Sequence, residues 1–404
     1  MALDLMSGLP KPDGKFSAHV LALNSGSSSL KFGIYRVAPL EVVVSGEAAS
    51  VGGDTGTFHV RDGSGNVLIS ETVSLPGQRE AIERLARFLA TADLPAPMAV
   101  GHRIVHGGPT LRQHCLIDDQ VVRDMESATA FAPLHMPAAL SVVRFAREHF
   151  PGLAQVVCFD TTFHAGLPDV SRILPIARTL RSAGIQRYGF HGLSCESIVR
   201  QLGADLPQRM IIAHLGNGAS LTAVKDGTSI DTSMGLTPTG GVIMGTRSGD
   251  LDPGVLIYLM REKNFDAAML EDLVNRQSGL LGISGLTSDM RRLHDAAAAN
   301  PDARFSIDIF CYSVRKQMAA MIAALDGVDL VVFTGGIGEH DAEVRARICA
   351  GLSWMGIVLD DARNRCANNP ISGPGSRCLV RVLESREDEQ IALHTRSLLL
   401  RRLS

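Results

Sequence analysis

The sequence predicts an α/β protein with two related halves. Apolar runs that resemble strands alternate with helix-like segments through the first part of the chain, which is the pattern of an α/β fold. A strand–turn–strand motif rich in Gly and small polar residues also occurs twice. A length of 404 residues is enough for two or three domains, so we expect more than one domain.

The elements of the first half follow in order. The segments "HVLALN" (19–24) and "LKFGIYRV" (30–37) predict two strands joined by a short turn, which make a hairpin. Residues 41–74 are rich in Val, Gly, Ser and Thr and predict further strands. "QREAIERLARFLATA" carries apolar residues at helical spacing, and a strand, a helix and a strand follow at "MAVGHRIVHGG", "AALSVVRFAREHF" and "QVVCFD".

The second half repeats the hairpin pattern. In "MIIAHLGNGASLTAVKDG" (210–227), the residues "NGASL" (217–221) match "GSSSL" (26–30), and each set lies between two apolar strands. We favour an internal duplication over a chance match. Further on, "RFSIDIFCYSVRKQMAAMIAALDG" predicts a long helix, "DLVVFTGGIG" a buried strand, and "DEQIALHTRSLLLRRLS" a final helix whose arginines suit a helix C-terminus.

Composition and charge exclude several classes of protein. The net charge of −3 and the pI near 6.5 provide no basic field for nucleic acid or an anionic membrane. No apolar run approaches the roughly 20 residues that span a bilayer, and the opening "MALDLMSGLPKPDGK" lacks a signal pattern, so we expect a cytoplasmic protein. The seven cysteines include no Cys-x-x-Cys pair and predict reduced thiols.

Three turns combine an apolar strand with Gly and small polar residues: "NSGSSSLK", "HLGNGAS" and "FTGGIGEH". Exposed backbone N–H groups in such turns bind phosphate oxygens, and Lys31 would neutralise charge there. One such turn alone is more often an ordinary hairpin, but three in one chain favour a nucleotide. None has the spacing of a P-loop or of Gly-x-Gly-x-x-Gly, which disfavours those folds.

Charged residues lie beside glycines between these turns. Arg103, Asp160, His191 and Arg247 lie where predicted strands give way to loops, which is where functional residues often lie. Each one alone also fits a surface ion pair or a capped helix, but their repetition favours a site. Five histidines lack the spacing of metal ligands, which disfavours zinc: His106, His135, His164, His191 and His214.

Taken in order, these segments resemble the acetate kinase family. The match runs from about residue 19 to residue 340 and continues more weakly to the end. The motifs that carry it are "LNSGSSSLK", "GHRIVHGG", "APLHMP", "FDTTFH", "RYGFHG", "HLGNGAS", "DTSMGLTPTGGVIMGTRSGDLDPG", "SGLLGISGLTSDMR" and "FTGGIGE".

The resemblance implies two duplicated actin-like (ribonuclease H-like) domains with mixed central sheets and a nucleotide cleft between them. A flexible tail would span residues 1–15, and the first domain would span 16–160 and be rejoined by a C-terminal helix at about 390–404. The second domain, 161–389, would carry the nucleoside site. The family also forms homodimers.

The resemblance further implies a reaction and its residues. Acetate and ATP would react reversibly, by in-line transfer, to acetyl phosphate and ADP, with Mg²⁺ as the ion and Mn²⁺ as a substitute. The catalytic residues would be Arg103, Asp160, His191 and Arg247. The substrate pocket would contain Arg103, Val105, Leu134, Phe190 and Pro238. The nucleotide would be bound by Ser27, Ser29, Lys31, His214, Leu215, Gly216, Asn217, Gly218, Asp289, Met290, Arg291, Gly336, Ile337, Gly338, Glu339 and His340. The metal would be held by Asn24 and Glu387, with Asp388 and Glu384 as alternatives.

These residue types suit the chemistry. Phosphoryl transfer needs positioning and charge neutralisation, which Lys31, Arg103 and Arg247 would supply together with His191 and Mg²⁺. A carboxylic acid with a pKa of about 4 is already ionised at neutral pH, so acetate needs no base. We therefore hypothesise that Asp160 acts through magnesium or its waters.

The chain departs from the family pattern at several positions. The carboxyl-terminal "PTNEE" appears here only as "ESREDE". The other departures are Met136 for Asn, Cys195 for His, Thr239 and Gly240 for Leu-Glu, and His340 for Asn. They concern the metal site and the edge of the nucleoside site, whereas the central charges are kept, so we expect an active enzyme.

Three alternatives remain open. Propionate or butyrate kinase is one, because a methylene in an apolar pocket is worth only about 1–3 kcal/mol, although Val105 favours acetate. A nucleotide-dependent regulatory protein on the same fold is the second, and the retained arginines speak against it. The third is diphosphate as phosphoryl donor, whereas Gly336 and Ile337 leave room for adenosine.

Overall fold

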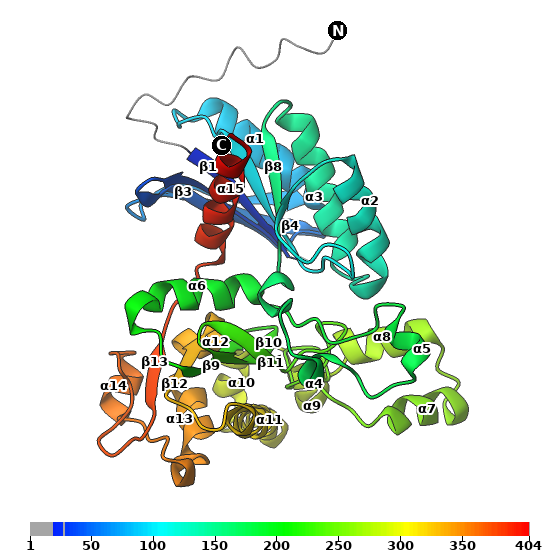
Figure 1. Ribbon diagram of the computed structural model, residues 1–404, viewed down its shortest axis with the longest axis vertical. Coiled ribbons are helices and arrows are strands. Elements are labelled where there is room, and N and C mark those ends of the chain that lie inside the picture. The colour runs from blue at the N-terminus through cyan, green and yellow to red at the C-terminus, as the bar shows by residue number, and fades with distance from the viewer. Residues whose placement is uncertain (1–18, 27–28, 404) are drawn as a thin grey trace.

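The computed structural model describes residues 19–26 and 29–403. The fold is α/β as predicted, with two mixed sheets, one in the upper and one in the lower part of Figure 1. Both the predicted tail, 1–15, and Ser27 lie outside the described residues.

The N-terminal sheet has the strand order β5-β4-β3-β2-β1-β6-β8-β7. Its strands are β1 His19–Ser25, β2 Ser29–Val37, β3 Leu40–Ala49, β4 Gly53–Asp62, β5 Val67–Leu75, β6 Ala99–Ile104, β7 Cys115–Leu116 and β8 Ala154–Phe159. β1 pairs antiparallel with β2 and parallel with β6, and β6 pairs parallel with β8. The predicted hairpin and the predicted strands within 41–74 are confirmed.

Helices cover both faces of this sheet, so successive residues of β1 are buried on opposite sides. Leu21 and Leu23 pack in a cluster with residues of α1 (Gln78–Thr91) and α3 (Met136–His149). Val20 and Ala22 pack instead with Ile391 and Ala392 of α15 (Glu387–Leu403). The final helix begins at Glu387, slightly earlier than predicted, and its first turn contains three acidic residues, Glu387, Asp388 and Glu389.

The C-terminal sheet has the order β11-β10-β9-β12-β13. Its strands are β9 Arg209–Leu215, β10 Ala219–Lys225, β11 Thr228–Thr232, β12 Leu330–Thr334 and β13 Leu379–Val382. β10 pairs antiparallel with β11 and β9, and β12 pairs parallel with β9 and β13. The five strands β3-β2-β1-β6-β8 of the N-terminal sheet show the same succession of two antiparallel and two parallel pairs. This repeated topology supports the duplication inferred from the two hairpin motifs.

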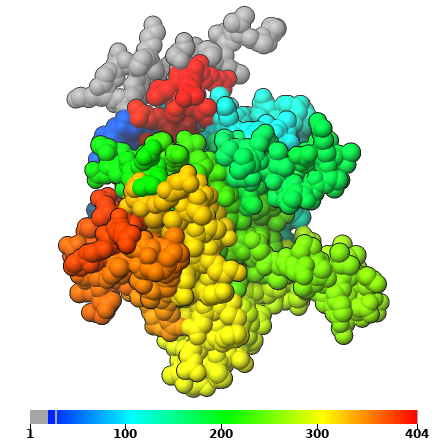
Figure 2. Space-filling model, turned by 60° about the horizontal axis from the view of Figure 1, so that its bottom comes forward, coloured from blue at the N-terminus to red at the C-terminus, as the bar shows by residue number. Residues whose placement is uncertain are grey.

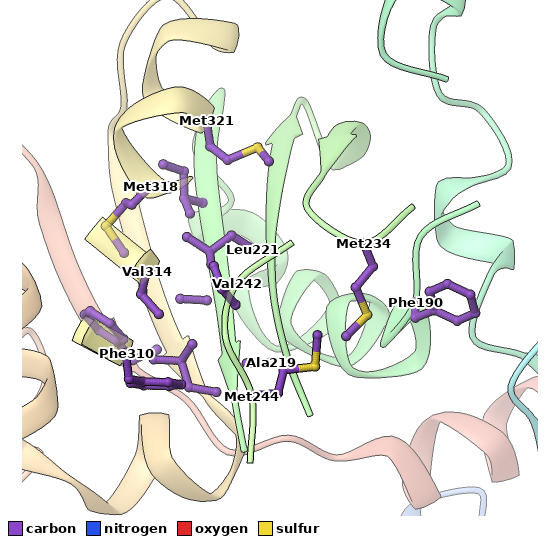
Figure 3. Close-up of a cluster of buried hydrophobic side chains, with 14 of the residues drawn as sticks. Phe190, Ala219, Leu221, Met234, Val242, Met244, Phe310, Val314, Met318 and Met321 are labelled. Atoms are coloured by element: carbon purple, nitrogen blue, oxygen red, sulfur yellow. The ribbon is translucent and has the colours of Figure 1, made fainter. Parts of the chain in front are cut away.

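The core of the C-terminal half lies between its sheet and α11 (Pro301–Ala324), the predicted long helix. Figure 3 shows Phe310, Val314 and Met318 of this helix facing Leu221 of β10. The remaining helices are α2 Asp119–Ser127, α4 Asp169–Arg172, α5 Arg178–Arg181, α6 Gly192–Leu202, α7 Pro253–Glu262, α8 Ala267–Arg276, α9 Gly279–Ser284, α10 Met290–Ala296, α12 Gly335–His340, α13 Ala342–Ala350 and α14 Asp361–Arg365. Short 3₁₀ helices span Ala128–Phe131, Thr162–His164, Gly203–Asp205 and Ser353–Met355.

Two predictions from composition can be compared with this structure. All seven cysteines are unpaired thiols. In the described part of the chain, every helix is too short or too polar to cross a lipid bilayer.

Candidate active site

A cleft of about 760 Å³ collects most of the predicted site residues, and its volume falls in the range usual for small-molecule sites. The predicted residues that line it are Asn24, Ser29, Lys31, Arg103, Val105, Asp160, Phe190, His191, His214, Gly216, Asn217, Gly218, Pro238, Arg247, Gly336, Glu339, His340 and Glu387. They come from both sheets and the loops that follow their strands, from α12 and from the start of α15. The cleft therefore lies where the two halves meet.

Seven described residues of the predicted set do not line this cleft: Leu134, Leu215, Asp289, Met290, Arg291, Ile337 and Gly338. Leu215 and Gly338 are buried in the C-terminal half, and Asp289 caps α10 and pairs with Arg291 at 2.7 Å. A sequence motif marks a segment near a ligand, but it does not tell which of its side chains point inward.

Arg103 in β6 is the centre of a charged network. Its Nε and Nη2 donate to the Asp160 carboxylate at 3.0 and 2.6 Å, and its Nη1 donates to Asn24 Oδ1 at 3.0 Å. Burial alone would lower the pKa of Arg103, but Asp160 and the nearby acidic residues raise it overall. Burial raises the pKa of Asp160, and Arg103 offsets part of that effect. The guanidinium therefore stays charged and is held in a fixed direction, with one N–H on each terminal nitrogen unused by these bonds.

Two carboxylates at the start of α15 complete this network. Asn24 Nδ2 donates to Glu387 Oε2 at 3.1 Å and to Asp388 Oδ1 at 2.8 Å. Burial raises the pKa of Asp388, and the neighbouring Glu387 adds to that shift. Two carboxylates this close repel each other, so a cation beside them would be stabilised. Their oxygens are the ligand type that Mg²⁺ prefers, and the residues present thus fit this ion.

Stacked imidazoles face the same cleft from the C-terminal half. The rings of His191 and His214 stack with centroids 4.2 Å apart, and Nδ1 of His191 lies 2.9 Å from Ser220 Oγ. Burial lowers the pKa of both histidines, so the rings are neutral near pH 7. Ser385 donates to Ser194, which can then donate to Nδ1 of His214 at 2.8 Å and leave the ring proton on Nε2.

His135 also lines the cleft, although the sequence alone predicts no specific role for it. Its Nε2 lies 3.0 Å from Nη2 of Arg247, whose Nη1 donates to the backbone oxygen of Pro238 at 3.1 Å. Burial, and secondarily Arg247, lower the pKa of His135 to about 4, so Nε2 accepts this bond. The signal was present in "APLHMP", where a histidine lies among prolines and apolar residues, but a lone histidine is not specific.

Gly218 leaves open the space between the imidazole of His191 and the guanidinium of Arg247. A Cβ at this position would lie 3.2 Å from Nε2 of His191 and 3.5 Å from Nη1 of Arg247. Both groups therefore face the volume beside the β9–β10 turn, where a ligand can approach the backbone closely.

The third predicted turn, "FTGGIGEH", is a short helix, and the prediction of a simple turn there was wrong. Gly335 has a φ of +76° and turns the chain directly from β12 into α12. The Glu339 carboxylate accepts from Gly335 N at 2.8 Å and from Ser385 N at 2.9 Å. Although Glu339 lines the cleft, its carboxylate ties this turn to the segment that precedes α15.

Comparisons with known proteins agree with the fold. The acetokinase family profile matches residues 19–393. The chain is 41% identical to the acetate kinase of Methylocella silvestris, with 94% of this chain and 98% of that protein covered. The acetate kinase of Parabacteroides distasonis is 38% identical, with 94% and 99% covered.

Two solved structures have the same fold over their whole length. A propionate kinase from Francisella tularensis superposes with a TM-score of 0.89 at 34% identity, covering 94% of this chain and 100% of that one. The Porphyromonas gingivalis acetate kinase gives a TM-score of 0.84 at 35% identity, covering 95% and 100%. With its motifs, its paired actin-like halves and these relatives, the chain belongs to the acetokinase family.

Proposed function

We propose that this chain transfers the γ-phosphoryl group of ATP reversibly to acetate, producing acetyl phosphate and ADP. The observation that carries the proposal is that Arg103 and Arg247, from opposite halves, face one cleft together with neutral imidazoles. This arrangement can hold two anions against each other, which phosphoryl transfer to a carboxylate requires.

Acetate would bind beside Arg103. The unused N–H groups of the guanidinium can donate to a carboxylate, while Asp160 and Asn24 fix its direction. Val105, Phe190 and Pro238 line the cleft and would receive the methyl group. An ionised acetate oxygen then attacks phosphorus in line without a base.

The phosphates would lie between the two hairpins. Lys31 and Arg247 offset their charge, and the Nε2–H of His214 can donate to a phosphate oxygen. Closure of the two halves, which we assign to residues 16–160 with about 390–404 and to 161–389, would exclude water from the transferable group.

Mg²⁺ would be held by Glu387 and Asp388, with Asn24 orienting both carboxylates, and Mn²⁺ would bind the same oxygens. When bound, the ion offsets phosphate charge during transfer. Asp160 orients Arg103 directly, and we propose that it also reaches the ion through water.

A hydroxamate assay for acyl phosphate tests the function. We expect product with acetate and ATP, a loss of about 10³-fold or more in kcat for Arg247→Ala, and no change for the exposed His59→Asn. Comparison of kcat/KM for acetate, propionate and butyrate tests the substrate. A preference for propionate would replace acetate with the alternative, and absence of any acyl phosphate would reject the proposal.

We also propose a cytoplasmic homodimer that associates through α7. Every residue of this helix is at least partly exposed, and Figure 2 shows its region projecting from the body of the molecule. Its exposed apolar side chains are Val255, Ile257, Tyr258 and Met260. Such a patch is typical of an interface. Light scattering after chromatography should give a dimer for the wild type and a monomer for Ile257→Asp; a monomeric wild type would contradict the proposal.

A further inference from the structure

Away from the cleft, three side chains from distant parts of the chain gather at one point. His114 lies in the loop before β7, Glu196 in α6 and His394 in α15. Their ligand atoms lie within 4.8 Å of one another. Glu196 Oε1 is 3.4 Å from His114 Nε2, and Glu196 Oε2 is 2.6 Å from His394 Nε2.

We propose that His114, Glu196 and His394 form a second cation site, specific for Zn²⁺ or a similar transition-metal ion. Two imidazoles and one carboxylate are a recurrent ligand set for zinc, with the fourth position left to water. They differ from the oxygen ligands beside Asn24 in the cleft, which suit Mg²⁺. The two sites therefore select different ions.

A tetrahedral ion bound to one oxygen of Glu196 requires the carboxylate to turn. Ligands about 2.1 Å from tetrahedral zinc lie about 3.4 Å apart, and the contact between His114 Nε2 and Glu196 Oε1 already has this length. His394 Nε2 instead contacts the other oxygen, Oε2, at 2.6 Å, so the carboxylate has to turn until one oxygen faces both rings. The exposed fractions of the side chains are 8%, 15% and 26% for His114, Glu196 and His394, so an ion can enter from the side of His394.

A neighbouring amide competes with the ion for His394. Arg200 donates to Gln390 Oε1 at 3.0 Å, and the Gln390 amide nitrogen then lies 3.0 Å from Nε2 of His394, the atom that would bind the ion. This contact has to break when the ion binds.

The hydrogen bond between Phe159 and His114 also opposes the ion and limits its affinity. Phe159 N donates to Nδ1 of His114 at 3.1 Å, so the ring proton is on Nε2 in the ion-free state. Binding through Nε2 moves that proton to Nδ1, and the ring must turn away from the amide of Phe159. We therefore expect micromolar rather than nanomolar affinity, together with faster hydrogen exchange at the Phe159 amide.

The position of this site gives it a consequence for the cleft. The helix α6 begins directly after His191, and α15 begins at Glu387. An ion that joins Glu196 to His394 ties these two helices together a short distance from the residues they present. Bound zinc would thus hold the halves at one separation and slow turnover.

Titration of the metal-free chain with Zn²⁺, in competition with a chromophoric chelator, tests the site directly. We expect micromolar binding that Glu196→Gln and His394→Asn each weaken about 100-fold or more, and that the exposed His59→Asn leaves unchanged. Glu387→Gln should also leave it unchanged. Loss of binding in Glu387→Gln but not in His394→Asn would place zinc in the cleft and overturn the proposal.

A second measurement does not depend on the folding of any variant. X-ray absorption of the wild-type chain with bound Co²⁺ or Zn²⁺ should show two imidazole ligands. A spectrum with oxygen ligands alone, or no binding at micromolar concentration, would also overturn the proposal. Because both experiments measure binding, their failure is separate from a failure of acetate kinase activity.

Discussion

The two sheets share one topology but present different chemistry to the cleft. The penultimate pair of the first hairpin is Asn24 opposite Lys31, and the equivalent pair of the second is His214 opposite Ser220. The first pair belongs to a charged network with Arg103, whereas the second holds neutral imidazoles. Equivalent backbone positions thus supply a lysine and an amide bound to Arg103 on one side of the cleft, and an imidazole and a hydroxyl on the other.

The difference follows from what burial costs each group. A buried charge is stable only when it is paired, so the N-terminal half needs Asp160 beside Arg103. A buried histidine can lose its proton instead, so the C-terminal half needs only hydroxyl partners such as Ser194 and Ser220. The hairpins themselves also differ, since Ser25 opposite Leu30 closes the first and Leu215 opposite Ala219 closes the second, shorter one.

The largest effect is expected from breaking the charged network. Arg103→Ala should lower kcat about 10³-fold or more and lower the free energy of unfolding by about 3–5 kcal/mol, because it leaves Asp160 buried without its partner. Initial rates and urea unfolding measure the two effects. The double variant Arg103→Met/Asp160→Asn should be more stable than Arg103→Met alone, but it should remain inactive. If both had the same free energy of unfolding, the unpaired Asp160 would not be the cause of the instability.

Substitution of the stacked histidines in the C-terminal half should change activity rather than stability. His191→Ala should lower kcat about 10²- to 10³-fold, because it removes a donor facing the transferred group. His191→Gln, which keeps a hydrogen-bond donor without a titrating ring, should recover part of this loss. Steady-state kinetics with His59→Asn as the control check this. If His191→Gln were as inactive as His191→Ala, the ring would have a role beyond that of a neutral donor.

The pH dependence tests the neutrality of the histidines. Burial lowers the pKa of His102, His106, His135 and His164 to about 4 each, below the unfolded value of about 6.5. The unfolded state therefore binds more protons, so the stability that these groups contribute is present above pH ~6.5 and falls as the pH drops toward 4. Thermal unfolding between pH 7.5 and 4.5 measures this.

The lowered pKa values of the cleft histidines also affect the pH dependence of catalysis. The profile of kcat/KM should show no limb from His191 near pH 6.5, since burial moves the pKa of His191 well below that value; burial lowers the pKa of His214 as well. A limb at that pH that disappears in His191→Gln would instead indicate a charged imidazole.

The smallest effect is expected from substitution of Gly216 and Gly218, two glycines of the same hairpin. Gly218→Ala should raise the KM for ATP several-fold, because its Cβ would crowd His191 and Arg247. Gly216→Ala, whose Cβ meets only backbone atoms at 3.4 Å or more, should change it less than about twofold. Similar values for both variants would argue against a special role of the space beside Gly218.

Much of this architecture could be predicted from the sequence because its signals are local. The hairpins, α1 and α11 each follow a period of two or near four residues within one segment. Arg103, His191 and Arg247 lie beside glycines in motifs of the family, and all three line the cleft.

The parts that were missed depend on partners far along the chain. The carboxylate of Glu339, in the helix α12 where a turn was expected, accepts a hydrogen bond from the amide of Ser385, 46 positions later. Asp289 is the opposite case, because it caps its own helix and pairs with Arg291 two positions later, which is a local contact. The cluster at Glu196 likewise joins three distant segments that have no common spacing.

The position of α15 has a consequence for how the protein is made. This last helix covers the face of the N-terminal sheet to which Val20 belongs, and its Thr395 lies so close to Gly101 that a methyl group there would not fit. A ribosome synthesises β1 long before α15, so that face stays uncovered until α15 has been made. A nascent chain that stops short of Glu387 therefore lacks both this cover and the acidic residues that α15 contributes to the cleft.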